Sequence, residues 1–314
     1  MPKTDFDTLA TALLASYTAS QKVHANSLIL TIFGDFICAH GGVIWLGSLI
    51  RMVEPLGINQ RLVRTSVFRL TEKGLLQSRQ VGRRSYYSLT ETGFRQFSSA
   101  AERIYRYHEY HWDEEWCLVF TTLSNLQSED RERFRKELFW LGFNRLSRGV
   151  FAHPMVKLER VHKVVKEMGL ADAVVVMRAR TTGDDPNGVS GNMIRYNFNF
   201  DAMKEEYGDY VEHFNPLLEA ARASPQKSPQ LCFLVRLLLI HSYRRILLGE
   251  PEIPPELVPS DCLSHRARGL TEQLYKLICN PAEEYFMQLA EAEGGTLPTV
   301  DDEYFTRFGG ISAV

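Results

Sequence analysis

The apolar side chains of the first 75 residues recur at the spacing of helices. This pattern predicts a short amphipathic arm over residues 6–17, a helix from Ser27 to the glycines at 41–42, a second helix over 46–53 and a third from Asn59 to Gly74. Serine and asparagine commonly cap helix N-termini, and glycine commonly ends a helix. Two segments of strand composition follow, LLQSRQ and SYYSL, joined by the turn VGRR. Three helices and a hairpin in this order predict a winged helix-turn-helix domain.

The predicted third helix has two different faces. Its inward face carries Asn59, Val63, Ser66, Val67 and Leu70, and its outward face carries Arg61, Arg64, Thr65 and Phe68. In a winged helix the outward face enters the major groove. There Arg61 and Arg64 could donate two hydrogen bonds each to guanine, and Thr65 or Phe68 could touch a thymine methyl group. The alternative is that the arginines are only solvated and that Phe68 packs beneath the hairpin on Tyr86 or Tyr87.

Positive charge is concentrated in this region. From Asn59 to Arg84 the chain has seven Lys or Arg residues and one acid, a local charge of +6, while the whole chain is −2 and the remainder therefore −8. Such asymmetry is typical of one module that meets a phosphate backbone. We expect phosphate contacts from Lys73 at the end of the third helix and from Arg79, Arg83 and Arg84 of the hairpin. Arg69 of the third helix is assigned to the same DNA-binding surface.

Beyond the hairpin the pattern alternates between helices and strands. A helix over 92–106 is followed by a β-α-β-α-β order, with strands over 116–121, 146–152 and 173–178 and helices over 129–141 and 156–168. The middle strand could instead be a tight hairpin at Arg148-Gly149. This order predicts a ferredoxin-like α+β domain, whose open sheet edge commonly pairs with a second subunit.

The loop TTGDDPNGVSGN is the clearest internal boundary, and the chain beyond it is mainly helical. An apolar helix is predicted over 231–248 and a last one over 265–290, with a break at Pro281 as an option and a loose tail around Gly309-Gly310. The predicted fold class is α+β, with a helical arm over 1–25, a winged helix domain over 26–106, a ferredoxin-like dimerisation domain over 107–192 and a helical regulatory domain over 193–314.

Several classes of protein are not supported. The N-terminus lacks the pattern of a signal peptide, and the most apolar run, 231–240, is interrupted by Arg236 and is about half of what a membrane helix needs. We therefore expect a cytoplasmic protein without a membrane partner. Five scattered cysteines, with no C-x-x-C pair, favour reduced thiols.

Two weaker motifs resemble catalytic or metal sites. HEYHWDEE, from His108, is one residue short of a zinc-binding H-E-x-x-H motif, and GVSG, from Gly188, is short of a nucleophile elbow. A polar linker with a packed Trp112 is the preferred interpretation of the first motif. We predict no metal, no cofactor and no catalytic residue.

The segment VRTSVFRLTEKGLL has the residue spacing of winged-helix repressors of the GntR type. Together with VGRRSYYSLTETG, WCLVFTTL, FWLGFNRLSRGVFAHP and IHSYRRILLGEPEIPPELVP, it resembles the PaaX family of repressors of phenylacetic acid catabolism over nearly the whole chain. The resemblance implies a homodimeric repressor of phenylacetate-degradation genes that binds pseudo-palindromic double-stranded operator DNA. It also implies release of the operator by the effector phenylacetyl-CoA.

An acyl-CoA effector needs cations for its phosphates beside an apolar pocket. Arg178 and Arg180 offer cations at the end of the last central strand, and His241, Arg244 and Arg245 share one face of the apolar helix. The alternative role of these last three is to form salt bridges with acids of a neighbouring domain.

Two other functions stay open. One is a same-fold repressor that answers a different acyl-CoA or aromatic acid. The other is a nucleic-acid-processing enzyme with a ferredoxin-like catalytic domain, which would need clustered carboxylates to hold Mg²⁺, and the strand at 116–121 carries none.

Overall fold

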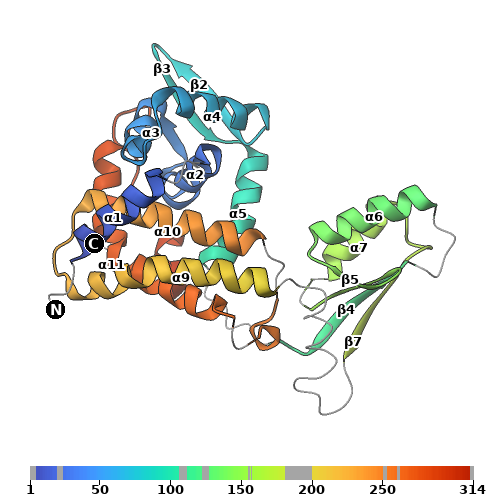
Figure 1. Cartoon of the computed structure of the whole chain (residues 1–314). Helices are drawn as coiled ribbons and strands as arrows, with labels where there is room; N and C mark the ends of the chain where they lie inside the picture. The colour runs from blue at the N-terminus through green and yellow to red at the C-terminus, as the bar shows by residue number, and fades with distance from the viewer. Residues whose placement is uncertain are drawn as a thin grey trace. The chain divides into compact units, whose positions relative to one another are not determined.

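The computed structural model describes residues 5–19, 24–105, 112–121, 127–154, 156, 158–180, 200–249, 253–259 and 262–311. It divides into two compact units, a first unit of residues 1–107, 207–248 and 266–314 and a second unit of residues 108–206 and 249–265. Each unit combines helices with an antiparallel sheet, which confirms the predicted α+β class. Figure 1 shows the elements of both units.

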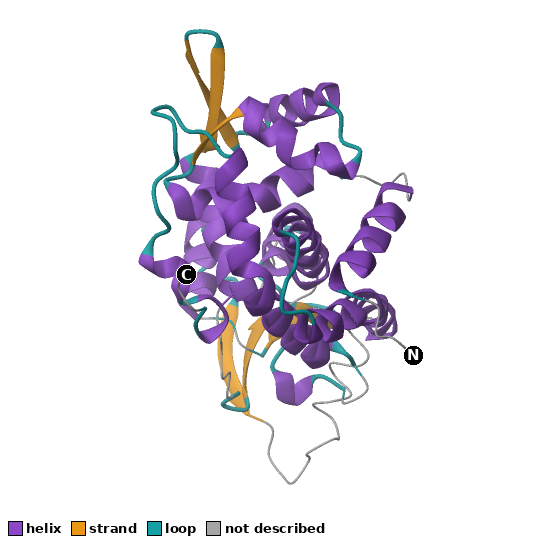
Figure 2. Ribbon diagram, turned by 90° about the vertical axis from the view of Figure 1, so that its left-hand side faces the viewer, coloured by secondary structure: helices purple, strands orange, loops and turns teal. Residues whose placement is uncertain are grey.

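The N-terminal part of the first unit is a winged helix, as predicted. Its elements are α1 (Phe6–Ala19), α2 (Ala25–Ile32) with a π-helical turn (Phe33–Ile37) and a 3-10 turn (Cys38–His40), β1 (Val43–Trp45), α3 (Leu46–Val53), a 3-10 turn (Glu54–Leu56), α4 (Gln60–Glu72), β2 (Leu76–Val81) and β3 (Arg84–Leu89). The strands form an antiparallel sheet in the order β1-β3-β2. Figure 2 shows the β2–β3 hairpin, the wing, projecting beyond the helices.

The start of α2 differs from the prediction. The helix begins at Ala25 after His24, and neither Ser27 nor any other side chain caps it. Ser27 instead lies in the first turn, where its hydroxyl accepts a hydrogen bond of 2.7 Å from Arg244. Residue type alone predicts a cap at Ser27, but a tertiary contact with Arg244 uses its hydroxyl instead.

The ends of α4 agree with the prediction. The Asn59 side chain accepts a hydrogen bond of 2.9 Å from the Leu62 amide, and Gly74 follows the last turn with a left-handed φ of 66°. Of the predicted inward face, Val63, Ser66, Val67 and Leu70 are buried, whereas Asn59 is exposed because it caps the helix. Both the position and the rotation of the recognition helix were therefore readable from the sequence.

The rest of the first unit is helical. It contains α5 (Glu91–Tyr105), most of α9 (Phe200–Ala223), α10 (Pro229–Gly249), most of α11 (Ser264–Leu289), α12 (Asp302–Phe305) and a 3-10 turn (Arg307–Gly309). The predicted apolar helix is α10, which is buried on nearly all sides between residues 232 and 246. The last long helix, α11, continues through Pro281 without a break. The compact units thus divide the chain differently from the predicted domains, because the C-terminal helices share one unit with the winged helix.

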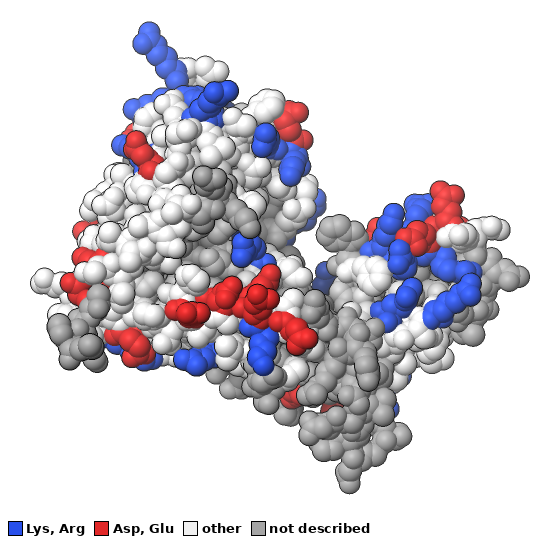
Figure 3. Space-filling model, viewed as in Figure 1, with Lys and Arg blue, Asp and Glu red and all other residues white. Residues whose placement is uncertain are grey.

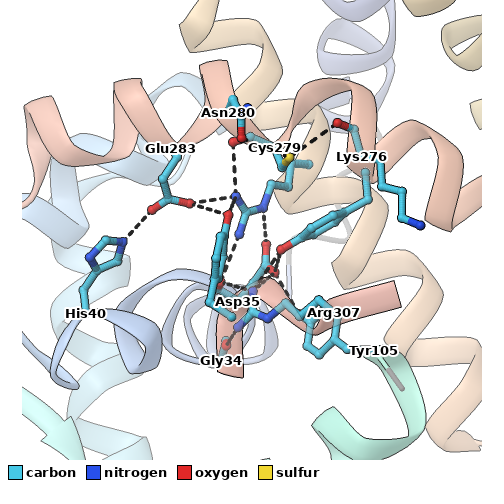
Figure 4. Close-up of polar contacts among 12 residues, drawn as sticks. Gly34, Asp35, His40, Tyr105, Lys276, Cys279, Asn280, Glu283 and Arg307 are labelled. Atoms are coloured by element: carbon cyan, nitrogen blue, oxygen red, sulfur yellow. Dashed lines mark hydrogen bonds and ion pairs between the residues drawn. The ribbon is translucent and has the colours of Figure 1, made fainter. Parts of the chain in front are cut away.

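A buried ionic network joins the helices of the first unit (Figure 4). Asp35, in the π-helical turn after α2, has no exposed side-chain surface, and its carboxylate accepts hydrogen bonds from Arg236 Nε at 2.8 Å and Arg307 Nη1 at 3.1 Å. Arg236 also donates to Glu283 at 2.9 Å. Three tyrosine hydroxyls complete the network: Tyr105 and Tyr275 donate to Asp35, and Tyr304 donates to Glu283. Every charge in it thus has both an opposite charge and hydrogen bonds.

This network corrects the expectation of a loose tail around Gly309-Gly310. Arg307, Phe308 and Ile311 are buried, and the Arg307 guanidinium stacks over the Tyr105 ring at 4.4 Å. At Glu283, burial opposes the charged form, but hydrogen bonding to His40 and the charge of Arg236 hold the pKa at about 2. Glu283 is therefore ionised at neutral pH.

The second unit is a ferredoxin-like domain, as predicted. It contains β4 (Glu115–Phe120), α6 (Ser128–Trp140), β5 (Asn144–Ser147), β6 (Val150–His153), α7 (Leu158–Glu167), β7 (Val175–Arg180) and a 3-10 turn (Pro255–Leu257). The alternative of a hairpin at Arg148-Gly149 is correct, so the order is β-α-β-β-α-β. The sheet order is β5-β6-β4-β7 with antiparallel neighbours. Apolar side chains of α6 and α7 pack on one sheet face around Val119, Phe134 and Val161.

Two features that the sequence speaks against are a membrane-spanning helix and a disulfide framework. Within the described segments, no helix has both the length and the hydropathy required to cross a bilayer. All five cysteines are free, and four of them are buried.

The buried network yields a stability prediction. Replacement of Asp35 by alanine leaves Arg236 and Arg307 buried without their shared carboxylate, and we expect the free energy of unfolding to fall by about 3–5 kcal/mol. Urea unfolding followed by circular dichroism measures this change. The control is Glu284→Ala, an exposed acid on α11 beside Glu283, which should change stability by less than about 0.5 kcal/mol. Equal effects of the two substitutions would contradict the role given to Asp35.

Candidate nucleic-acid interface

The outward face of α4 is exposed where the sequence predicts DNA contacts. Arg61, Arg64, Thr65 and Arg69 are all exposed, and Phe68 keeps 63% of its surface accessible. The alternative that Phe68 packs beneath the wing is therefore not what the structure adopts. Because the buried and exposed residues of α4 lie on opposite sides, the core holds the helix while these side chains stay free for a partner.

The wing carries the second group of predicted cations. Val81 pairs with Arg84, and Gly82 and Arg83 form the two-residue turn between the strands, with Gly82 at a φ of 58°. Arg79, Arg83 and Arg84 are exposed, as is Lys73 at the C-terminal end of α4. Figure 3 shows Lys and Arg atoms gathered over α4 and the wing. The cations predicted for DNA contact thus belong to one module of the first unit.

Two of the wing arginines are paired with acids far along the chain. Arg84 donates to Glu291 at 2.7 Å and lies 4.3 Å from the centre of the Trp45 ring, and Arg79 forms an ion pair with Glu293. Glu291 also accepts from Arg51 at 2.7 Å. Hydrogen bonding to Arg51 is the main cause that lowers the pKa of Glu291; burial opposes it, and hydrogen bonding to Arg84 adds to the lowering. Sequence reasoning missed these acids, because more than 200 residues separate them from the wing and no local pattern points to the pairing.

The remaining cations of the interface, unlike Arg79 and Arg84, have no acidic partner in the described segments. Within the described segments, no acidic side chain forms an ion pair with Arg61, Arg64 or Arg69, nor with Lys73 or Arg83. With its amide oxygen turned toward Arg64, Gln60 lies 3.0 Å from that guanidinium. These five cations therefore keep their charge available for phosphates or bases.

The predicted effector residues belong to two different compact units. Arg178 and Arg180 belong to the second unit, where Arg178 pairs with Glu115 at 3.1 Å and Arg180 donates to the Asp113 carbonyl at 2.6 Å. His241, Arg244 and Arg245 belong to α10 in the first unit.

The alternative role of the α10 residues was to form salt bridges with acids. The neighbours of His241 and Arg244 are instead uncharged groups of Thr31 and Ser27. The buried His241 ring lies 3.3 Å from the Thr31 hydroxyl, and Arg244 donates to the Ser27 carbonyl at 3.1 Å and to its hydroxyl. Burial, with the charges of Arg244 and Arg245 adding to it, lowers the pKa of His241 to about 3. His241 is therefore neutral at physiological pH and does not supply a cation for a phosphate, whereas Arg245 is exposed.

His108, His111 and the GVSG segment lie outside the described residues. Trp112 packs edge to face on Trp116 within the second unit, and its indole donates to the carbonyls of Glu115 and Pro154. Across the part of the chain that is described, no group of three or more His, Cys, Asp or Glu side chains is arranged to hold a metal ion.

A recognition helix and a wing that both present cations define a winged-helix DNA-binding regulator of transcription. Family models match most of the chain: "PaaX-like protein" at residues 24–93, "PaaX protein central Cas2-like domain" at 109–189 and "PaaX-like protein C-terminal domain" at 198–288. The chain belongs to the PaaX family.

Two similar proteins extend this finding. The transcriptional repressor PaaX of Escherichia coli (strain K12) is 34% identical over 295 residues, which is 92% of each chain. Among solved structures, the uncharacterized protein Rv0674 from Mycobacterium tuberculosis matches with a TM-score of 0.51 and 18% identity, over 83% of this chain and 98% of that one. At this identity the second similarity concerns the fold alone.

The ion pairs of the wing generate a prediction. The variant Glu291→Gln/Glu293→Gln frees Arg84 and Arg79 for phosphate, and we expect operator affinity at low salt to rise by about two- to fivefold. The gain should shrink at high salt, because exposed charges are screened. Fluorescence anisotropy with labelled duplex DNA measures both effects.

The matched control removes the same two charges elsewhere. Glu284 and Glu303 are exposed acids of the same unit and form no ion pair with the wing in the described structure. If Glu284→Gln/Glu303→Gln raises affinity equally, net charge and not the wing pairing is responsible.

Proposed function

We propose that this protein is a transcriptional repressor of phenylacetate catabolism genes that binds its operator through α4 and the wing. The observation that carries the proposal is the exposed cationic face of α4, held by a buried opposite face. The similarity to the repressor of Escherichia coli over 92% of the chain supports the same function. Arg61 and Arg64 are assigned to base edges, and Lys73, Arg79, Arg83 and Arg84 to phosphates.

A homodimer is the second part of the proposal. Two copies of α4 would then reach successive major grooves of a pseudo-palindromic operator. The sheet of the second unit supports such pairing, because β5 and β7 are edge strands and Met177 on β7 is 49% exposed.

The third part concerns the effector. We assign phenylacetyl-CoA as the ligand that releases the operator, which family membership supports. Such a ligand shifts the protein away from DNA only by its higher affinity for the state that does not bind DNA.

The first test concerns α4. The variant Arg61→Ala/Arg64→Ala should bind the operator at least about tenfold more weakly, since each bidentate contact with a base contributes about 1–3 kcal/mol. Electrophoretic mobility shift assays with a fragment spanning the promoter of the phenylacetate genes measure this loss, and a scrambled duplex measures non-specific affinity. Circular dichroism verifies that the variant is folded.

The control is Arg222→Ala/Arg266→Ala, which removes two exposed arginines of α9 and α11 and should leave operator affinity within about twofold. A folded Arg61→Ala/Arg64→Ala variant with unchanged affinity and unchanged dependence on salt would refute the proposed interface.

The second test concerns the effector. Phenylacetyl-CoA should dissociate the retarded operator complex, whereas free phenylacetate and acetyl-CoA at the same concentrations should leave it intact. The same fragment and mobility shift assay serve all three ligands. Persistence of the complex with phenylacetyl-CoA would show that the effector has been assigned wrongly, while operator binding itself would stand.

A further inference from the structure

A cavity of about 180 Å³ lies inside the first unit, where α2, α5 and α10 meet. Its apolar wall comes from Leu30 on α2, Phe97 and Ala100 on α5, and Ile240 and Leu248 on α10. An apolar cavity of about 150 Å³ accommodates one benzene molecule. The space therefore suits a single aromatic ring with a short substituent, whereas a coenzyme would have to remain outside it.

One wall of the cavity is polar, at Arg244 of α10. Its guanidinium is held by the two oxygens of Ser27, both uncharged, and its buried Nε has no hydrogen-bond partner among the described residues. Burial lowers the pKa of Arg244, so the environment opposes its charge, and no acid of the described residues forms an ion pair with it. Asp35 also lines the cavity, but Arg236 and Arg307 already neutralise it.

The cavity also borders the base of the wing. Leu75, Leu89 and Gly93 line it, and the Thr90 amide donates to the Leu75 carbonyl at 3.0 Å. A Cβ atom at Gly93 would lie 2.2 Å from the Leu75 carbonyl oxygen, so α5 touches the chain immediately after α4 with no spare room. A ligand that moved α5 would consequently shift the junction between the recognition helix and the wing.

We propose that this cavity binds a single-ring aryl-acyl ligand, with the ring against Phe97, Ala100 and Ile240 and its carbonyl or carboxylate oxygen accepting a hydrogen bond from Arg244. This assignment rests on the proposed function and places its effector site next to the wing. It replaces the assignment of His241, Arg244 and Arg245 to coenzyme phosphates. A free arylacetic acid and its coenzyme A thioester share this chemistry, and the experiment separates them.

The test is isothermal titration calorimetry of the full chain without DNA, with phenylacetyl-CoA, phenylacetate and acetyl-CoA. The variant Ala100→Phe fills the cavity and should bind the aromatic ligands at least tenfold more weakly. Ser98→Phe, which adds the same ring at an exposed position of the same helix, should bind within twofold of the unchanged protein. Acetyl-CoA lacks the ring and should bind at least tenfold more weakly than phenylacetyl-CoA.

A second variant tests the polar wall. Arg244→Met keeps a long side chain but removes the donor, and we expect a loss of about tenfold or more in affinity for the aromatic ligand. Because Arg244 also holds Ser27, Ala100→Phe remains the decisive variant if Arg244→Met does not fold.

The outcomes separate the site from the function. Unchanged ligand affinity of folded Ala100→Phe, or no binding of either aromatic ligand to the unchanged protein, would overturn the proposal. Tighter binding of the thioester or of the free acid identifies the source and supports the site in either case. If the proposed function were wrong, the unchanged protein would not retard the operator fragment in the mobility shift assay.

Discussion

The carboxylate of Asp35 is the group around which the first unit is assembled. It lies without exposed surface in the π-helical turn after α2, and it accepts hydrogen bonds from Arg236 of α10, Arg307 of the C-terminal turn, Tyr105 of α5 and Tyr275 of α11. A buried charge is tolerated only when it is paired and fully hydrogen-bonded. This requirement ties four segments to the winged helix, and it explains why the C-terminal helices belong to the same unit.

The same assembly bears on the DNA-binding surface. α11 leads into Glu291, whose backbone carbonyl accepts from the Trp45 amide and whose carboxylate holds Arg84 of the wing. α5 carries Tyr105 to the network at one end, and at its other end it contacts the junction between α4 and the wing. Of the helices that hold Asp35, α5 thus also contacts the junction between α4 and the wing, and α11 leads to the acid that pairs with the wing. A change at the core therefore has a short physical path to the DNA-binding residues.

The cavity beside Arg244 lies between the Asp35 network and the base of the wing. It is bounded by α2, α5 and α10, and both Asp35 and the base of the wing contribute to its wall. The charge of Asp35 is paired with two arginines and stabilises the fold. Arg244 has an unused hydrogen-bond donor in the described structure, which it can offer to a ligand. Repression and its relief would then depend on two charges of one unit in different electrostatic environments.

The sequence alone determined the winged helix, the rotation of α4 and the ferredoxin-like order, because capping residues and the periods of helices and strands are local properties of a chain. Asn59, Gly74 and the buried face of α4 are examples. It did not determine which distant groups meet. Three partners of Asp35, namely Arg236, Tyr275 and Arg307 of the tail, lie more than 200 positions from it. The acids beside Arg79 and Arg84 and the Ser27 partner of Arg244 are equally distant. Only tertiary packing selects such pairs, since a buried charge specifies that it needs a partner but not which residue supplies it.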